Sequence, residues 1–240
     1  MTGSAVMLIE AQTITMAETQ TILFDLDGTL IDTTRLILRC FDHSWEKVCG
    51  RIHSREALIE TFGIPLREAM RRLVAVTNDL TDGESDQPAI VEQLLVEYRL
   101  FNATNHDRLA QPFPNVRPVI EELRARGYSI GVVTSKSREL ACRGLRLCSL
   151  DDLVDEAVFL EDTDRHKPDP APIFAALKRL KVSPQRGAYI GDSRHDIIAG
   201  RAAGVRTVAA LWGPFPRAEL EREKPDHLAE SINGLLDIFD

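Results

Sequence analysis

The second half of the chain alternates between short apolar segments and amphipathic segments, and this alternation limits the possible folds more than any other feature. Apolar segments typical of buried strands lie at residues 129–134, 156–160, 187–192 and 205–211. Apolar spacing and glycines after the last turns predict helices over residues 116–127, 138–148, 170–180 and 194–204. Strands that alternate with helices in this way predict a parallel sheet with helices on both faces.

A further apolar segment, TILFDL at residues 21–26, predicts a buried parallel strand far upstream of the others. Between them the pattern is helical, with helices expected over residues 35–49, 54–62, 65–76 and 88–104 and a loop at 78–87. The predicted fold class is therefore α/β, a Rossmann-like doubly wound parallel sheet with an inserted all-helical domain. We assign residues 20–32 and 113–240 to the α/β core and residues 33–112 to the insert. Residues 1–19 are expected to be a loose extension, and Met16 is a possible biological start.

Composition and charge narrow the functional classes. The formal net charge is −8 and the pI is about 5.3, so we expect no binding to nucleic acid or to an anionic membrane. The sequence contains no apolar segment long enough for a membrane span and no convincing signal peptide. The four cysteines are scattered without metal-ligand spacing, which suggests a reducing compartment. We expect a cytoplasmic protein, either a monomer or a homodimer.

Polar side chains follow three of the predicted strands, where ligands bind in open parallel sheets. These side chains, with one lysine that precedes a predicted helix, are Asp25, Asp27, Thr134, Ser135, Lys167, Asp192 and Asp196. Carboxylates gathered at one edge need a cation, and hard oxygen ligands favour Mg²⁺. A metal ion, a lysine and hydroxyl donors together suit a dianion such as a phosphoryl group.

The segment DLDGT places two acids one residue apart. Gly28 allows a sharp turn and brings backbone N–H groups towards an anion. A metal ion would draw charge from Asp25, while Asp27 could carry a proton without the same penalty. Different surroundings can thus give two similar acids different roles.

Four segments, DLDGT, VVTSK, HKPDP and GDSRHD, resemble in order and spacing the four motifs of the haloacid dehalogenase superfamily of phosphohydrolases. The resemblance extends from about Thr21 to the C-terminus. The helical insert resembles the cap domain that follows the first motif in this family. The resemblance implies a Mg²⁺-dependent hydrolase that acts on a small phosphorylated metabolite.

The resemblance also implies a role for each catalytic residue. Asp25 would be the nucleophile that forms an aspartyl-phosphate. Asp27 would protonate the leaving oxygen and then act as a base on the hydrolytic water. Thr134 would hold the phosphoryl oxygens, and Lys167 would screen the charges of nucleophile and phosphate.

The resemblance further implies the metal and substrate contacts. Asp192 would bind Mg²⁺ together with Asp25 and the backbone carbonyl of Asp27, and Asp196 would support the metal directly or through water. The remaining candidates for substrate contact are Gly28, Thr29, Ser135 and, in the insert, Arg67. Two histidines beside the motifs, His166 and His195, are expected to be incidental.

The substrate depends on the insert, where two subgroups of the family are suggested. FGIPLREAM resembles phosphoglycolate phosphatases, whereas YRLFNATNHDRL and the C-terminal tail resemble bacterial pyrophosphatases. The substrate that we expect first is a phosphoglycolate-like phosphomonoester. Inorganic pyrophosphate is the alternative, for which the candidate cations are Arg67, Arg71, Arg99 and Arg108.

Three other activities remain for comparison. A phosphosugar mutase is an open alternative, because sequence does not show how the insert handles an intermediate. A haloacid dehalogenase is disfavoured, because it has no leaving alkoxide to protonate and normally lacks the acid that Asp27 supplies. A non-catalytic binding protein is disfavoured because no key side chain of the four motifs is missing.

Overall fold

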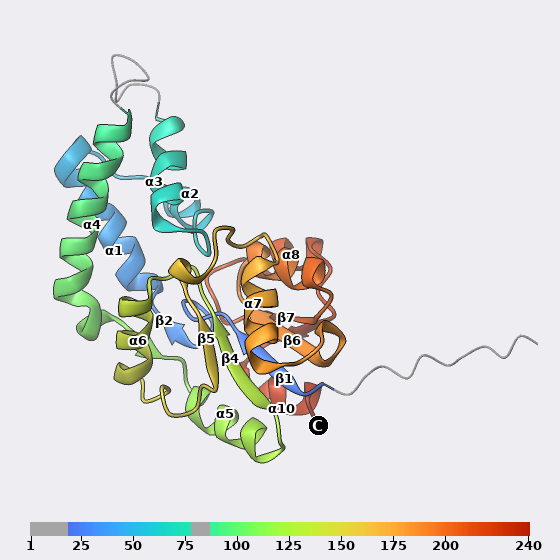
Figure 1. Cartoon of the computed structure of the whole chain (residues 1–240). Coiled ribbons are helices and arrows are strands. Elements are labelled where there is room, and N and C mark those ends of the chain that lie inside the picture. Colours follow the sequence, from blue (N-terminus) through green and yellow to red (C-terminus); the bar gives the residue numbers. More distant parts are fainter. Residues whose placement is uncertain (1–18, 78–86) are drawn as a thin grey trace, which may run out of the picture.

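The computed structural model describes residues 19–77 and 87–240. Residues 1–18 of the expected extension, with Met16, and residues 78–86 of the loop predicted at 78–87 lie outside these ranges, and Gln87 belongs to a helix. The described chain forms two lobes, a helical cap above an α/β core (Figure 1).

The core contains a six-stranded sheet in the order β5-β4-β1-β6-β7-β8 with every neighbouring pair parallel. Its strands are β1 (Thr21–Phe24), β4 (Ser129–Val133), β5 (Glu156–Val158), β6 (Gly187–Gly191), β7 (Arg206–Ala210) and β8 (His227–Ala229). The predicted α/β fold class is confirmed. The sheet brings β1, β4 and β6 together at its centre, so the three strands that end in polar residues are neighbours.

Alternate side chains of the strands enter two separate hydrophobic clusters. Ile22 and Phe24 of β1 pack in the larger cluster, and Leu23 packs in the other. Helices α5 (Val116–Ala125), α6 (Arg138–Leu147) and α10 (Leu235–Ile238) contribute to the first cluster. Helices α7 (Ala171–Leu180) and α8 (Arg194–Ala203) contribute to the second, and α9 (Arg217–Arg222) packs in a small third cluster with α8 and β7. Helices therefore cover both faces of the sheet, as predicted.

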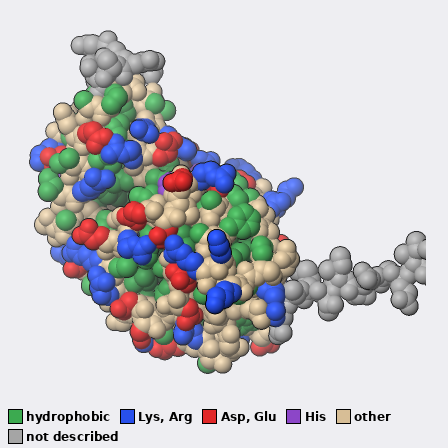
Figure 2. All heavy atoms as spheres, viewed as in Figure 1, with side chains coloured by type: hydrophobic (Ala, Val, Ile, Leu, Met, Phe, Trp, Pro, Cys, Tyr) green, Lys and Arg blue, Asp and Glu red, His purple; other side chains and the backbone are tan. Residues whose placement is uncertain are grey.

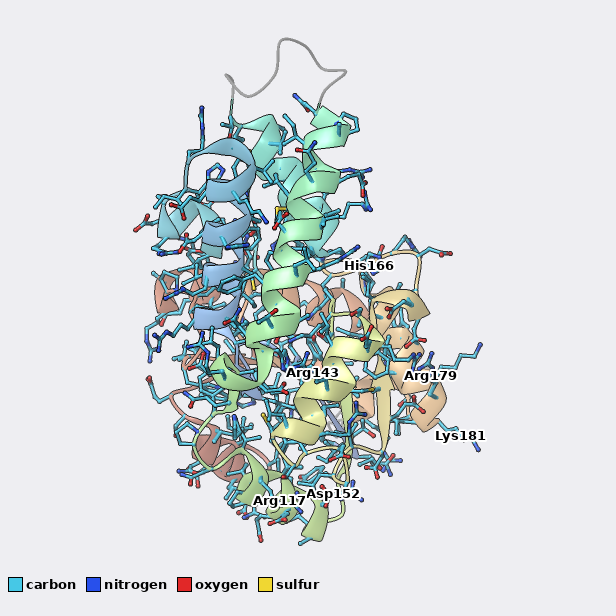
Figure 3. The ribbon with its side chains drawn as sticks, turned by 90° about the vertical axis from the view of Figure 1, so that its left-hand side faces the viewer. Arg117, Arg143, Asp152, His166, Arg179 and Lys181 are labelled. Carbon is cyan, nitrogen blue, oxygen red and sulfur yellow. The ribbon has the colours of Figure 1, made fainter. Side chains whose placement is uncertain are left out.

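The cap consists of α1 (Thr34–Cys49), α2 (Arg55–Ile59), α3 (Leu66–Ala75) and α4 (Gln87–Leu109). Gly50 caps the end of α1 with a φ of 64°, which a residue without a Cβ adopts most readily. The facing sides of α1 and α4 are apolar, and the rings of Phe41 and Tyr98 meet edge to face at 5.2 Å. Between α4 and α6 of the core, the Arg143 guanidinium donates to Asp107 at 2.8 Å (Figure 3).

Two short antiparallel strands lie where the chain leaves the core and returns to it. Strand β2 (Ile31–Asp32) pairs with β3 (Gln111–Pro112), so that Ile31 faces Pro112 and Asp32 faces Gln111. These strands fall at the boundaries proposed for the helical insert. The chain therefore enters and leaves the cap side by side, directly after the loop that carries Asp25 and Asp27.

Some local predictions were wrong. The predicted strand at 156–160 ends at Val158, and Leu160–Asp162 forms a 3₁₀ helix. The cause is local. The Phe159 N–H donates to the Asp162 carboxylate at 2.8 Å, so this N–H is not available to continue the strand pairing. Strand β8, the β2–β3 pair and helices α9 and α10 were not predicted.

On the surface view, cationic and anionic side chains are interspersed over both lobes (Figure 2). No helix within the described residues has the length and apolar content that crossing a membrane requires. The four cysteines are free thiols, and the most deeply buried, Cys40, packs in the main hydrophobic cluster.

Candidate active site

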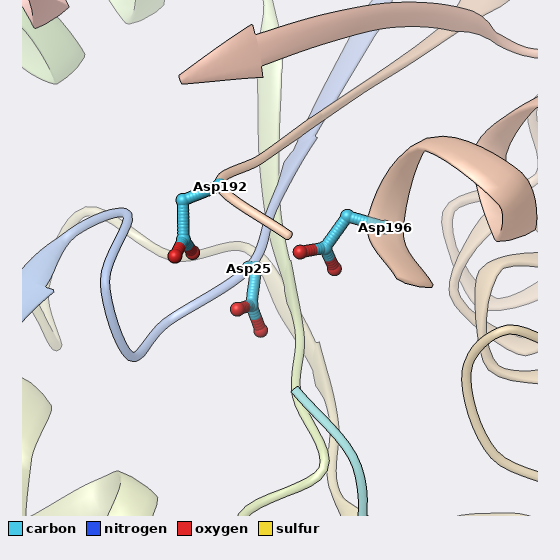
Figure 4. A group of neighbouring side chains, drawn as sticks. All are labelled: Asp25, Asp192 and Asp196. Carbon is cyan, nitrogen blue, oxygen red and sulfur yellow. The ribbon is translucent and has the colours of Figure 1, made fainter. Parts of the chain in front are cut away.

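Three carboxylates meet at the carboxyl ends of the central strands (Figure 4). Asp25 directly follows β1, Asp192 directly follows β6, and Asp196 lies in the first turn of α8. Each has one oxygen within 4.8 Å of the others, and all three residues are buried. The sheet topology thus brings together three of the residues predicted from sequence.

Lys167 supplies the cation of this cluster. Its Nζ lies 2.7 Å from Asp25 Oδ1 and 2.7 Å from Asp196 Oδ1, and it donates to the hydroxyl of Tyr189 at 3.0 Å. Its side chain is 1% exposed. Tyr189 was not a predicted site residue, because in sequence it is simply an aromatic residue within a buried strand.

One ammonium cannot neutralise three carboxylates. Burial raises the pKa of Asp25 to about 7; Lys167 opposes the rise, and the charge of Asp196 adds to it. Burial and the charges of Asp196 and Asp25 raise the pKa of Asp192 well above its usual range. Burial alone would raise the pKa of Asp196, but Lys167 and the hydrogen bonds from Ser193 outweigh it and lower that pKa. The excess negative charge and the all-oxygen donor set fit a hard divalent cation such as Mg²⁺.

Asp192 is held by close backbone approach and by one hydroxyl. Thr29 donates a buried hydrogen bond to Asp192 Oδ1 at 2.9 Å. A Cβ at Gly28, where φ is +86°, would lie 2.5 Å from Asp192 Oδ2, and one at Gly213 would lie 2.3 Å from the Asp192 Cβ. Gly28 and Thr29 were predicted as substrate contacts, but the Thr29 hydroxyl is used to orient Asp192. Gly213 was not predicted.

Asp196 is fixed by the start of α8. Its Oδ2 accepts from the Ser193 N–H at 3.0 Å and from the Ser193 hydroxyl at 2.6 Å, and the Ser193 hydroxyl accepts from the Asp196 N–H at 3.3 Å. This reciprocal capping box leaves Oδ1 for Lys167 and for the hydroxyl of Tyr189, which lies 3.0 Å away. Asp196 is thus both a helix-capping residue and a member of the carboxylate cluster.

Asp27 has surroundings different from those of Asp25. Its Oδ1 accepts from the Thr33 hydroxyl at 2.8 Å and from Lys136 Nζ at 2.7 Å, and its side chain is 22% exposed. The two acids of DLDGT are therefore separated into a buried carboxylate beside Lys167 and a more open one beside Lys136. Lys136 was not among the predicted site residues.

A cleft of about 480 Å³ opens over Asp25, Asp27 and Asp192 between the core and the cap. The cap segment after α2 covers it, and the Ser135 hydroxyl donates to the Gly63 carbonyl there at 2.8 Å. A Cβ at Gly63 would lie 2.9 Å from the Ser193 Oγ, so the cap segment rests directly on the start of α8. In this arrangement the cap segment at Gly63 contacts the core beside the carboxylates.

Half of the predicted site residues line this cleft: Asp25, Asp27, Thr134, Ser135 and Asp192. Arg67 is placed elsewhere: it is half exposed and forms an ion pair with Glu92 of α4, beside Arg71 in a separate hollow of the cap. Of the four arginines considered for pyrophosphate, Arg99 lines the cleft.

His195 is buried, and neither ring nitrogen has a hydrogen-bond partner within the described chain. Burial lowers the pKa of His195 to about 4, so this ring is neutral near pH 7. His166 lies in the loop before Lys167 (Figure 3).

A helical cap over the site, a buried aspartate paired with a lysine, and two further carboxylates, one at a strand end and one at a helix start, are the features of a phosphohydrolase-type site on an α/β core. The comparison with known proteins agrees, because residues 22–210 match the haloacid dehalogenase-like hydrolase family. The chain belongs to this family and is a hydrolase with a helical cap inserted after the first strand.

Relatives with assigned activities match nearly the whole chain. Pyrophosphatase PpaX of Bacillus mycoides is 36% identical over 219 residues, which cover 91% of this chain and 96% of the relative. A protein of Caldanaerobacter subterraneus subsp. tengcongensis, provisionally named pyrophosphatase PpaX, is 41% identical over 218 residues, covering 91% and 93%. Among solved structures, a predicted phosphoglycolate phosphatase of Haemophilus somnus has a TM-score of 0.84 at 23% identity, covering 94% of this chain and all of that one. The structural likeness shows the fold alone.

Proposed function

We propose that this protein is a Mg²⁺-dependent phosphatase that hydrolyses inorganic pyrophosphate through an aspartyl-phosphate on Asp25. The observation that supports pyrophosphate as the substrate is the match along 91% of the chain to a protein named as a pyrophosphatase. The relatives therefore favour the alternative substrate of the sequence analysis over the phosphoglycolate-like phosphomonoester that it ranked first. Two cationic side chains that line the cleft, Lys136 and Arg99, support a substrate with a high negative charge.

Asp25 would bind Mg²⁺ together with Asp192 and the Asp27 carbonyl, with Asp196 in support. When bound, Mg²⁺ would offset the charge of the carboxylates and of the phosphoryl oxygens. Lys167 keeps the Asp25 carboxylate in place through the 2.7 Å contact, and Thr134 lies in the cleft where its hydroxyl could donate to a phosphoryl oxygen. Because these groups are already in position before the attack, they do not have to reorganise during it.

The reaction has two steps. An Asp25 oxygen attacks phosphorus, the bond from that phosphorus to the bridging oxygen breaks, and the second phosphate leaves with the electron pair of that bond and a proton from Asp27. A water molecule then attacks the same phosphorus and transfers a proton to Asp27. The bond to Asp25 breaks, its electron pair returns to the carboxylate, and the first phosphate is released. Closure of the cap by the segment at Gly63 limits the water that can reach the aspartyl-phosphate.

The test is phosphate release from pyrophosphate, phosphoglycolate and a glucose phosphate, with Mg²⁺ and with a chelator. We expect kcat/KM to be at least about tenfold higher for pyrophosphate than for either monoester, and the chelator to abolish turnover. The glucose phosphate also tests the mutase alternative, because a mutase would give an isomeric sugar phosphate. A higher kcat/KM for phosphoglycolate would refute the proposed substrate.

A further inference from the structure

A second lysine in the cleft has no part in the mechanism described above. Lys136 follows β4 two residues after Thr134, and its side chain is only 10% exposed. Its backbone is fixed, because its N–H donates to the Thr134 hydroxyl at 3.2 Å and its carbonyl accepts from the Leu160 N–H at 3.0 Å. A mostly buried ammonium on a fixed loop is costly unless anionic groups surround it.

Lys136 lies beside Asp27, the acid assigned above to the leaving oxygen. Its Nζ is 2.7 Å from Asp27 Oδ1, whereas Lys167 contacts Asp25 and Asp196. In the proposed reaction the transferred phosphoryl group lies over Asp25. The part of the substrate that departs must lie within reach of Asp27, and therefore next to Lys136.

Helix α4 of the cap adds two polar side chains to the lining of the same cleft. Asn102 is 4% exposed and lines the cleft, yet its Oδ1 has no hydrogen-bond partner within the described residues. Its amide nitrogen contacts Cys40 Sγ at 3.7 Å. Burial raises the pKa of Cys40 to about 12, and Lys136 is close enough to oppose this rise. Lys136 and Asn102 thus share a neighbour, and Arg99, one helical turn before Asn102, lines the same cleft.

A buried polar atom without a partner is uncommon and marks a place where a ligand or water completes the structure. Either end of the Asn102 amide can face the cleft after a half-turn of the side chain. The amide could then donate to a phosphate oxygen or accept from a protonated one. Two cations and an amide that line one cleft suit a second phosphoryl group better than an uncharged alcohol.

We propose that Lys136, Arg99 and Asn102 form a second phosphoryl subsite that binds the leaving phosphate of pyrophosphate. This inference rests on the proposed function and goes further, because it assigns the residues that select a charged leaving group. The electron pair of the breaking phosphorus–oxygen bond stays on the bridging oxygen, which takes a proton from Asp27, and the negative charge that develops on this oxygen during the step lies next to Lys136 Nζ. The leaving alcohol of a simple phosphomonoester brings no second phosphoryl group, so the same lysine contributes less to its release.

The experiment compares two substrates in the full-length chain with Mg²⁺, pyrophosphate and glycerol 2-phosphate, whose leaving group is uncharged. For Lys136→Met we expect kcat/KM for pyrophosphate to fall about 10²–10³-fold, the effect of removing one preorganised donor to developing charge. For glycerol 2-phosphate we expect a loss of less than about tenfold. Lys136→Arg keeps the charge and should restore at least part of the pyrophosphate rate. Lys178→Met, at an exposed lysine of α7, is the matched control and should behave like wild type.

The cap residues give an independent measurement. Arg99→Met and Asn102→Ala should each lower kcat/KM for pyrophosphate about tenfold or more, whereas Arg71→Met, a cap arginine outside the cleft, should not. Methylenediphosphonate, a pyrophosphate analogue that resists hydrolysis, should inhibit both cleft variants at least about tenfold more weakly than wild type. This comparison also decides the matter if Lys136→Met does not fold.

The outcomes separate the two proposals. If wild type hydrolyses pyrophosphate but the cleft variants lose equal factors on both substrates, the subsite is refuted and the proposed function stands. If wild type does not hydrolyse pyrophosphate, both proposals fail.

Discussion

Replacing Lys167 by methionine tests the electrostatics of the carboxylate cluster. The side chain is 1% exposed and forms two ion pairs at 2.7 Å, with Asp25 and Asp196. Methionine keeps much of the volume but removes the charge, which leaves buried carboxylates without their ammonium. Removing one partner of a buried ion pair costs about 3–5 kcal/mol of unfolding free energy.

The expected shift in melting temperature follows from the size of the chain. A loss of 1 kcal/mol lowers Tm by about 2–4 °C in proteins of this length, so Lys167→Met should lower Tm by about 6–20 °C at pH 8. The difference should shrink as pH falls. In wild type the lowered pKa of Asp196 contributes stability that is fully present above the unfolded-chain value of 3.8, so this contribution is unchanged between pH 8 and pH 5. In the variant Asp196 lacks its ammonium, so protonation relieves the buried charge.

The assay is thermal unfolding in chelator at pH 8 and pH 5, followed by the same scans with Mg²⁺. Mg²⁺ should raise the Tm of the variant more than that of wild type, because it meets more uncompensated negative charge. Lys178→Met, which removes an exposed lysine, is the control. A Tm within about 2 °C of wild type at pH 8 would show that Lys167 does not neutralise the cluster.

Three further predictions concern the metal site. Thr29→Val removes the 2.9 Å hydrogen bond to Asp192 and should weaken Mg²⁺ binding about tenfold or more, measured by calorimetry. Gly213→Ala would place a Cβ 2.3 Å from the Asp192 Cβ, so Mg²⁺ affinity and phosphate release should both fall about 10-fold or more; unchanged affinity would contradict the close packing. Because burial raises the pKa of Asp25 to about 7 without metal, Mg²⁺ binding should release protons between about pH 4 and pH 7 and should strengthen as pH rises through this range. Calorimetric titrations in two buffers of different ionisation enthalpy measure this release. Equal binding enthalpies in the two buffers would contradict the prediction.

The sequence predicts the centre of the molecule well, because its pattern there is repetitive. Buried strands of a parallel sheet are apolar throughout, and each central strand ends in a polar residue that interrupts the apolar run. The sequence pattern therefore predicts that Asp25, Asp192 and Thr134 lie at one edge of the sheet. Strand β8 is short and largely exposed, and β2 and β3 have two residues each, so none has a recognisable pattern.

The cleft could be predicted only in part, because long side chains reach positions that sequence does not specify. Lys136 is visible in VVTSK as a second basic residue, but only the folded loop shows that it reaches Asp27. The charge of Arg67 and its place near the start of α3 make it a candidate substrate contact in the sequence. The buried face of that helix is formed by Ala69, Met70, Leu73 and Val74. Arg67 lies at the margin of this face, where Glu92 of α4 binds it.

The most direct test of the account is whether Asp25 becomes phosphorylated during turnover. Wild type mixed with radiolabelled pyrophosphate and Mg²⁺, then quenched in acid within one turnover, should carry label on Asp25. Asp25→Asn should carry none and release phosphate at least about 10³-fold more slowly, while Asp152→Asn, at a surface ion pair with Arg117, should match wild type (Figure 3). Near-normal turnover by Asp25→Asn, or turnover by wild type without label, would contradict the mechanism.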